Sequence, residues 1–222
     1  MKVYMSADIE GISSTVCWEE CMPSDPRYPK AAEQMTREVL AACEGAFAAG
    51  AHEIFIKDAH GPGTNIDPFR MPPRTRLSRR WSEHPFSMVE GIDSSFDAAV
   101  YVGYHSAAGR DGSILSHTMS RQPLYVKLNG IYASEFMLYS YAAAYVGVGV
   151  SVRRSAAVPG ERGTAPLFGD HACKGGTCLC GGLRAADGGG GHDTRGYREG
   201  AAAGFIPRPD PSAGILHRGD QL

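Results

Sequence analysis

The 222-residue sequence lacks any long run of apolar residues, and it lacks an excess of charge of one sign. No stretch reaches the roughly 20 apolar residues that a membrane-spanning helix needs, and no basic and apolar leader marks a secretory signal. Its 22 Lys and Arg nearly balance its 24 Asp and Glu, which gives no reason to expect a nucleic-acid or membrane surface as a partner. We therefore expect a soluble, cytoplasmic protein that binds neither.

Cysteine occurs six times, but without the paired spacing that zinc fingers and zinc ribbons share. In a chain without a secretory signal we expect free thiols rather than a disulfide framework. Cys178 and Cys180 form a Cys-x-Cys pair that has no second pair to complete a metal site. The length suits one domain of ordinary size with a full core.

The first 150 residues alternate between strand and helix patterns, which predicts an α/β fold with a mostly parallel sheet flanked by helices. Strands are expected around residues 3–5 and 53–57. Between them, apolar residues recur every four positions and predict a helix over residues 30–49, with Gly50 as its cap.

The rest of the first 150 residues continues this alternation of strand and helix patterns. A nearly continuous apolar run at residues 98–103 predicts another buried parallel strand. Asn129-Gly130 predicts a tight hairpin, and Ser134 is expected to cap a helix that runs to about Tyr145. Residues 61–83 are rich in Pro and Arg and are expected to form a long surface loop or a weak excursion.

Residues 151–222 form a separate, atypical tail rich in Gly and Arg. They hold 16 of the 28 glycines and only 11 Val, Ile, Leu, Phe and Met residues. A segment so poor in large apolar groups cannot offset its chain entropy by burial, which predicts an irregular or disordered region. A second interpretation is that a GC-rich gene is read out of frame from about codon 150, since this also produces an excess of Gly, Ala, Arg and Pro.

Two carboxylates follow the first strand. Asp8 and Glu10 lie two residues apart, and side chains at this spacing point to the same side of a strand. They repel each other unless a cation lies between them or one stays protonated, although they could also be solvated residues at a strand end. Gly11 is expected to let the backbone turn and to leave room beside both carboxylates.

Further polar side chains follow the other elements. His60 and His105 come after the next two strands, and Glu135 begins the helix after the hairpin. Functional sites in open α/β sheets gather at the carboxyl ends of the strands. Three acids and two histidines could bind two divalent cations, and nitrogen and oxygen ligands fit zinc, with manganese or cobalt less specifically. Each residue also has a simpler interpretation, as a polar loop histidine or as the charge at a helix N-terminus.

Two such cations would lower the pKa of a shared water from ~15.7 to near 7 and would polarise a carbonyl group. His117 then remains as a candidate proton shuttle or transition-state stabiliser, unless it is an ordinary strand residue. Asp58 precedes His60 by two residues and is either its hydrogen-bond partner or a strand-end acid.

Five segments, in chain order and within residues 1–150, resemble the zinc-dependent D-aminopeptidase family. They are Met5–Ser13, Lys57–His60, Pro85–Gly91, Gly103–Ala107 and Leu115–Met119. The resemblance implies a dizinc aminopeptidase that removes N-terminal D-amino acids, such as D-Ala, from short peptides. In such an enzyme a metal-activated bridging water attacks the scissile carbonyl.

The resemblance also implies roles for individual side chains. Asp8 would bridge both zinc ions, one site being completed by Glu10 and His60 and the other by His105 and Glu135. The catalytic histidine would be His117. Family members form ring-shaped homodecamers that enclose their active sites, which would restrict this protein to short peptides.

The resemblance ends near residue 150. Residues 170–176 can be encoded by a DNA string whose neighbouring frame reads Thr-Thr-His-Ala-Lys-Glu-Gly, which is similar to what the family carries downstream. If the tail is disrupted, the chain is a non-catalytic metal-binding remnant of such an enzyme. Another amidohydrolase on the same dimetal scaffold is a third interpretation.

Overall fold

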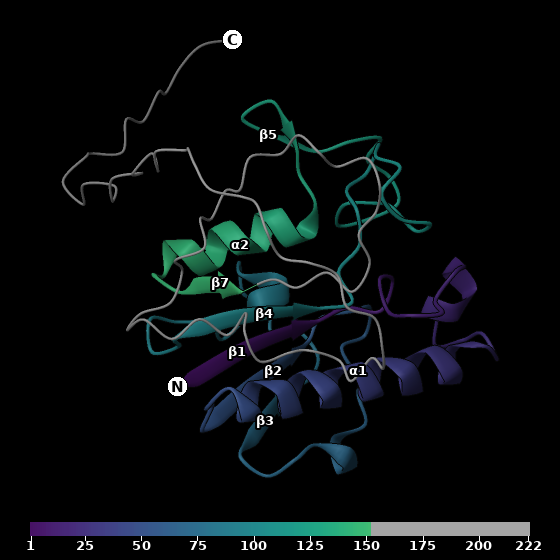
Figure 1. Ribbon diagram of the computed structural model, residues 1–222. Helices are drawn as coiled ribbons and strands as arrows, with labels where there is room; N and C mark the ends of the chain where they lie inside the picture. Colours follow the sequence, from purple (N-terminus) through teal and green to yellow (C-terminus); the bar gives the residue numbers. More distant parts are fainter. Residues whose placement is uncertain (152–222) are drawn as a thin grey trace, which may run out of the picture. The chain divides into compact units, whose positions relative to one another are not determined.

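Five parallel strands form the sheet of this protein, in the order β3-β2-β1-β4-β7. The computed structural model describes residues 1–151 (Figure 1). The strands are β1 (Lys2–Ala7), β2 (Glu53–Asp58), β3 (Thr75–Ser78), β4 (Ala98–Val102) and β7 (Gly149–Ser151). Strand β1 lies at the centre and pairs in parallel with β2 on one side and β4 on the other. The predicted α/β fold with a mostly parallel sheet is confirmed.

Helix α1 (Tyr28–Ala48) covers one face of the sheet. Its buried stripe includes Met35, Val39 and Cys43, which are spaced four residues apart as expected for one face of a helix. This stripe packs with Val3 and Met5, alternate residues of β1 that point to the same side of the pleat.

Helix α2 (Glu135–Tyr145) packs on the opposite face. Tyr139 and Ala143 of this helix belong to a second apolar cluster with Tyr4, which points to the other side of β1. The central strand is therefore buried on both faces, and this accounts for its almost continuous apolar sequence.

The predicted turn signals are confirmed. Gly50 follows α1 with a φ of +94°, a conformation that glycine adopts at little cost. Asn129 and Gly130 both have positive φ and join the short antiparallel strands β5 (Lys127–Leu128) and β6 (Ile131–Tyr132). The Ser134 side chain accepts a hydrogen bond from the Met137 N–H at the start of α2.

The prediction of a loop over residues 61–83 is wrong in part. The segment contains a 3₁₀ helix at Pro68–Arg70 and the edge strand β3, which pairs in parallel with β2. Most side chains of β3 are only partly buried, which explains why its sequence lacks a strong apolar signal. Further 3₁₀ helices lie at Trp18–Cys21 and Ser87–Val89.

Cys17, Cys21 and Cys43 are free thiols, as expected. The predictions for residues 152–222, including the Cys178 and Cys180 pair, lie outside the residues that the structure describes. Among the helices of the described part, none combines the length and apolar character needed to cross a membrane.

Candidate metal centre

Three of the predicted residues follow three parallel strands and lie at the same edge of the sheet. Asp8 directly follows β1, His60 comes two residues after β2, and His105 comes three residues after β4. Because these strands run in the same direction and are neighbours, their carboxyl ends lie side by side. Glu135 is added by the first turn of α2.

Close packing of two loops fixes the position of Asp8. The Asp8 N–H donates to the Val102 carbonyl at 2.9 Å, and the Gly11 N–H donates to the Gly103 carbonyl at 2.7 Å. A Cβ atom at Gly11 would lie 2.5 Å from the Tyr104 carbonyl oxygen. Gly11 does not have a positive φ, so its lack of a side chain serves this close approach rather than the predicted turn.

The Asp8 carboxylate lies between two histidines. His60 Nδ1 is 3.2 Å from Asp8 Oδ1, and His105 Nε2 is 3.4 Å from Asp8 Oδ2. Only 2% of Asp8 is exposed to solvent. The two oxygens of one buried carboxylate thus face two different histidines, which is the arrangement that a bridging ligand requires.

Two further buried carboxylates complete the cluster. Glu10 Oε2 lies 2.9 Å from His60 Nδ1, and Glu135 Oε1 lies 3.5 Å from His105 Nε2. The backbone N–H of Met119 donates to Glu135 Oε1 at 2.6 Å and fixes its orientation. The cluster therefore divides into a half around His60 and a half around His105, with Asp8 common to both.

His117 also reaches this cluster. Its Nε2 lies 3.6 Å from Glu135 Oε1 and 3.9 Å from Glu10 Oε1. One potential ligand atom each from His105, His117 and Glu135 lies within 4.8 Å of the others, and the same holds for Asp8, Glu10 and His105. The structure thus brings all six predicted side chains together.

Each histidine of the cluster contacts a backbone carbonyl with its outer ring nitrogen. The contacts run from His60 Nε2 to Cys21 O at 2.9 Å, from His105 Nδ1 to Ser106 O at 3.0 Å and from His117 Nδ1 to Leu115 O at 2.9 Å. A carbonyl only accepts hydrogen bonds, so each outer nitrogen carries a proton and the inner nitrogen faces the carboxylates. Histidines that bind metal ions are held in this way.

The sequence left two possible roles for Asp58, which precedes His60 by two residues, and the structure shows that its role is structural. Its buried carboxylate accepts hydrogen bonds from the backbone N–H of Asn65 and Ile66 and from the Asn65 side-chain amide. Asn65 Nδ2 also donates to the His60 carbonyl at 2.7 Å. Asp58 therefore positions His60 through the loop that follows it and does not contact its ring.

Burial and neighbouring charge change the pKa values of these groups. Burial and the adjacent Asp8 charge raise the pKa of Glu10 to about 7. Burial opposes ionisation of Asp8, but its contacts with His105 and His60 outweigh this effect and hold its pKa far below the usual range. Burial likewise disfavours the charged histidines, yet Asp8 and the nearby glutamates raise the pKa of His60 to about 11 and of His105 to about 10.

The polar atoms of the cluster fit a metal centre. Glu10 Oε2 and His105 Nε2 are buried and have no hydrogen-bond partner. Each lies within ion-pair distance of a neighbour, His60 for Glu10 and Asp8 for His105, but these pairs are poorly aligned for a hydrogen bond. Unpartnered buried polar atoms are costly, and a cation among the carboxylates would satisfy both. Carboxylate and imidazole ligands without thiolate are a typical zinc donor set.

Comparisons with known proteins show to which family this chain belongs. The model of peptidase family M55, described as D-aminopeptidase, matches residues 1–155. A D-aminopeptidase of Bacillus subtilis (strain 168) is 32% identical over 157 residues, which cover 68% of this chain and 54% of the relative. This chain belongs to the D-aminopeptidase family.

A solved structure supports the same assignment. It is described as "Zn-dependent D-aminopeptidase DppA from Bacillus subtilis, a self-compartmentalizing protease", and it matches with a TM-score of 0.64 and 32% identity. The match covers 68% of this chain and 54% of that chain. This member of the D-aminopeptidase family thus spans about half the length of the relatives that it matches.

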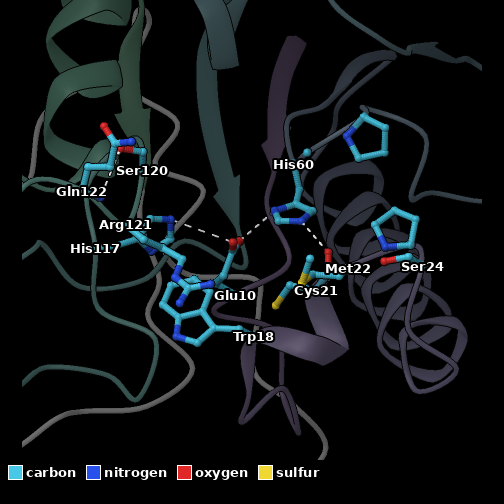
Figure 2. Close-up of a pocket in the computed structure, with 13 residues that line it drawn as sticks. Glu10, Trp18, Cys21, Met22, Ser24, His60, His117, Ser120, Arg121 and Gln122 are labelled. Atoms are coloured by element: carbon cyan, nitrogen blue, oxygen red, sulfur yellow. Dashed lines mark hydrogen bonds and ion pairs between the residues drawn. The ribbon is translucent and has the colours of Figure 1, made fainter.

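A cavity of about 530 Å³ opens beside the candidate metal centre of this D-aminopeptidase family member (Figure 2). Glu10, His60 and His117 face it. Trp18 and Arg121 also line it, and sequence reasoning assigned neither of them to the site. Trp18 begins a short 3₁₀ helix and is one of only two Trp residues in the sequence, which is the one signal that could have drawn attention to it.

Proposed function

We propose that this protein is a dizinc aminopeptidase that removes N-terminal D-amino acids, such as D-Ala, from short peptides. One observation carries the proposal: three histidines direct their inner nitrogens at three buried carboxylates while their outer nitrogens contact backbone carbonyls. Membership of the D-aminopeptidase family and the zinc dependence of the Bacillus subtilis relative support the same function.

In this proposal Asp8 would be a ligand of both zinc ions. Glu10 and His60 would hold one of them, and His105 and Glu135 would hold the other. When bound, the zinc ions supply a Lewis acid that polarises the substrate carbonyl and lowers the pKa of water. The buried surroundings of the carboxylates exclude bulk water and so strengthen these electrostatic effects.

His117 is the proposed catalytic histidine. The contact between its Nδ1 and the Leu115 carbonyl fixes the ring, whose Nε2 points toward Glu135 and Glu10 beside the cavity that His117 lines. Edge-to-face packing of Trp18 at 5.0 Å between ring centroids supports the same orientation. From this position Nε2 can accept a proton and return it to the amine that leaves when the peptide bond breaks.

The assembly and location of the protein are part of the proposal. We expect a cytoplasmic homo-oligomer, a decamer as the family resemblance implies, that encloses the active sites and admits only short peptides. The solved relative is described as self-compartmentalizing, which supports this expectation. Light scattering coupled to size-exclusion chromatography measures the oligomer directly.

The experiment that tests the function combines metal analysis with a substrate panel on the full 222-residue protein. We expect about two zinc ions per chain and release of D-Ala from D-Ala-D-Ala, with L-Ala-L-Ala hydrolysed at least about 100-fold more slowly. Bound zinc without turnover of any peptide would identify a non-catalytic remnant. Hydrolysis of L-peptides or of other amides in preference would identify a different amidohydrolase on this scaffold.

A further inference from the structure

One basic side chain lines the cavity beside the metal centre. Among the described lining residues, Arg121 is the only Lys or Arg. Within residues 1–151 no carboxylate forms an ion pair with Arg121, although several other arginines of this part are paired with Asp or Glu. A guanidinium without an acidic partner, exposed and facing a cavity, is available to an anion that enters it.

Aromatic stacking connects Arg121 to the catalytic side of the cavity. The guanidinium carbon lies 4.9 Å from the centre of the Trp18 ring, and this ring lies 5.0 Å from the His117 ring at a steep angle. These two contacts place the guanidinium no farther than about 10 Å from the His117 imidazole. Figure 2 shows Arg121 and Trp18 on the same side of Glu10 as His117, with His60 across from them.

The backbone before Arg121 is anchored to the metal centre. Met119 adopts a φ of +64°, which is rarely favourable for a residue with a long side chain. In this conformation the Met119 N–H donates to Glu135 Oε1 at 2.6 Å. Strained backbone of this kind is often retained where it serves a site, and here it fixes the start of the segment that carries Arg121.

We propose that Arg121, held against Trp18, binds the free C-terminal carboxylate of short peptide substrates. This inference rests on the proposed aminopeptidase function and names the class of peptide that the same site prefers. A planar guanidinium binds a carboxylate through two parallel hydrogen bonds, and stacking on an aromatic ring leaves both donors free.

The position of Arg121 limits the length of the peptide. In an extended chain each residue adds about 3.5 Å, so the carboxylate of a dipeptide lies about 3.5 Å from the scissile carbonyl and that of a tripeptide about 7 Å. A hydrogen bond between the guanidinium and a carboxylate spans a further ~3 Å. A guanidinium within about 10 Å of His117 can therefore reach the carboxylate of a dipeptide or of a tripeptide. The site should therefore favour di- and tripeptides with a free carboxylate over longer peptides and over peptide amides.

The kinetic test compares D-Ala-D-Ala with D-Ala-D-Ala amide, which differ only in the terminal charge. Arg121→Ala should lower kcat/KM for the acid about tenfold or more, mainly through KM, and should leave the amide within about twofold. Arg121→Lys should restore part of the loss, because lysine keeps the charge but not the two parallel hydrogen bonds. Arg110→Ala is the matched control, since Arg110 also stacks on an aromatic ring, Tyr132, but does not line the cavity.

A binding measurement separates this inference from the proposed function. Isothermal titration calorimetry on the metal-free full-length protein gives affinities for both dipeptides without turnover. The ratio of acid to amide affinity should fall at least about tenfold in Arg121→Ala and stay constant in Arg110→Ala. An unchanged ratio, or equal losses for acid and amide, overturns the assignment of Arg121 even in an active enzyme. A protein that hydrolyses neither dipeptide but shows the expected change in ratio refutes the aminopeptidase and leaves the carboxylate site in place.

Discussion

His105 and His117 lie face to face, with ring centroids 3.9 Å apart and an angle of 9° between the ring planes. Two imidazolium rings would repel each other at this distance, so at most one of the pair is charged. The contacts with Asp8 and Glu135 favour the charge on His105, and burial together with that charge lowers the pKa of His117. The stack therefore favours the proposed division of roles, in which His105 would exchange its proton for a metal ion and His117 would stay neutral and accept a proton.

Replacement of His117 tests this division of roles. His117→Gln should reduce kcat for D-Ala-D-Ala about 10²- to 10⁴-fold, as expected for the loss of a group that transfers a proton, and should leave zinc content unchanged. His84→Gln is the control, because His84 is exposed and lies outside the cluster. Full activity of His117→Gln refutes the catalytic role. Loss of zinc identifies His117 as a ligand, which its distance of 3.6 Å from Glu135 also permits.

Asp8 is the side chain that both halves of the proposed metal centre would share. In Asp8→Asn one carboxylate oxygen becomes an amide nitrogen that donates hydrogen bonds and cannot bind a cation. We expect affinity for both zinc ions to fall more than about 100-fold, which metal analysis after dialysis against a weak chelator measures.

Asp25→Asn provides the matched control for that experiment. Asp25 forms an exposed ion pair with Arg27 at 2.8 Å, and such surface pairs contribute little to stability. Its zinc content should equal that of the unmodified protein. Retention of one firmly bound zinc in Asp8→Asn would contradict the bridging role and indicate two independent sites.

Five of the six residues of the cluster were predictable because each closely follows a strand or begins a helix, whereas His117 lies in an irregular segment that ends no strand and begins no helix. Asp8 and His60 follow apolar runs that identify β1 and β2, and Glu135 follows a hairpin signal and a capping serine. Parallel strands meet at one edge of a sheet, so the order of elements alone brings these side chains together. Their assignment to one zinc ion or the other came only from the family resemblance.

Other parts depend on contacts that leave no periodic pattern. Strand β3 is a half-exposed edge strand of four residues, and its pairing with β2 decides its conformation. Trp18 begins a 3₁₀ helix, Arg121 lies in an irregular segment 103 residues further along the sequence, and the two meet only in the folded chain. Local sequence cannot indicate such a contact, because it arises from how two distant segments of the chain pack against each other beside the cavity.

Gly103 links the packing of the fold to the position of Asp8 in the candidate metal centre. A Cβ atom at this position would lie 2.1 Å from the Asp8 carbonyl oxygen, which forces the two loops apart. Gly103→Ala should destabilise the protein by at least about 3 kcal/mol and should also lower zinc content, because Asp8 is displaced. Chemical denaturation and metal analysis measure the two effects.

Gly147→Ala separates the steric effect from the backbone effect. Gly147 has a φ of +82°, similar to the +69° of Gly103, but a Cβ atom there would meet nothing within 4 Å. The replacement should cost only the roughly 1–2 kcal/mol of placing alanine in the left-handed region, without loss of zinc. If both replacements lower the free energy of unfolding by the same amount, the two loops at Gly103 move apart without strain.

Zinc is expected to change how the stability of this protein depends on pH. In the metal-free protein the pKa of His60 is raised to about 11 and that of His105 to about 10, against 6.5 in the unfolded chain. The stability that these histidines contribute is therefore complete below pH 6.5, declines as pH rises and is lost above pH 10 to 11. Zinc replaces the inner protons, so the Tm of the zinc-loaded protein should stay nearly constant from pH 7 to 9 while the Tm of the chelator-treated protein falls. Scanning calorimetry of both forms measures this difference. If the Tm of the metal-free protein also stays constant from pH 7 to 9, the folded protein holds both histidines neutral.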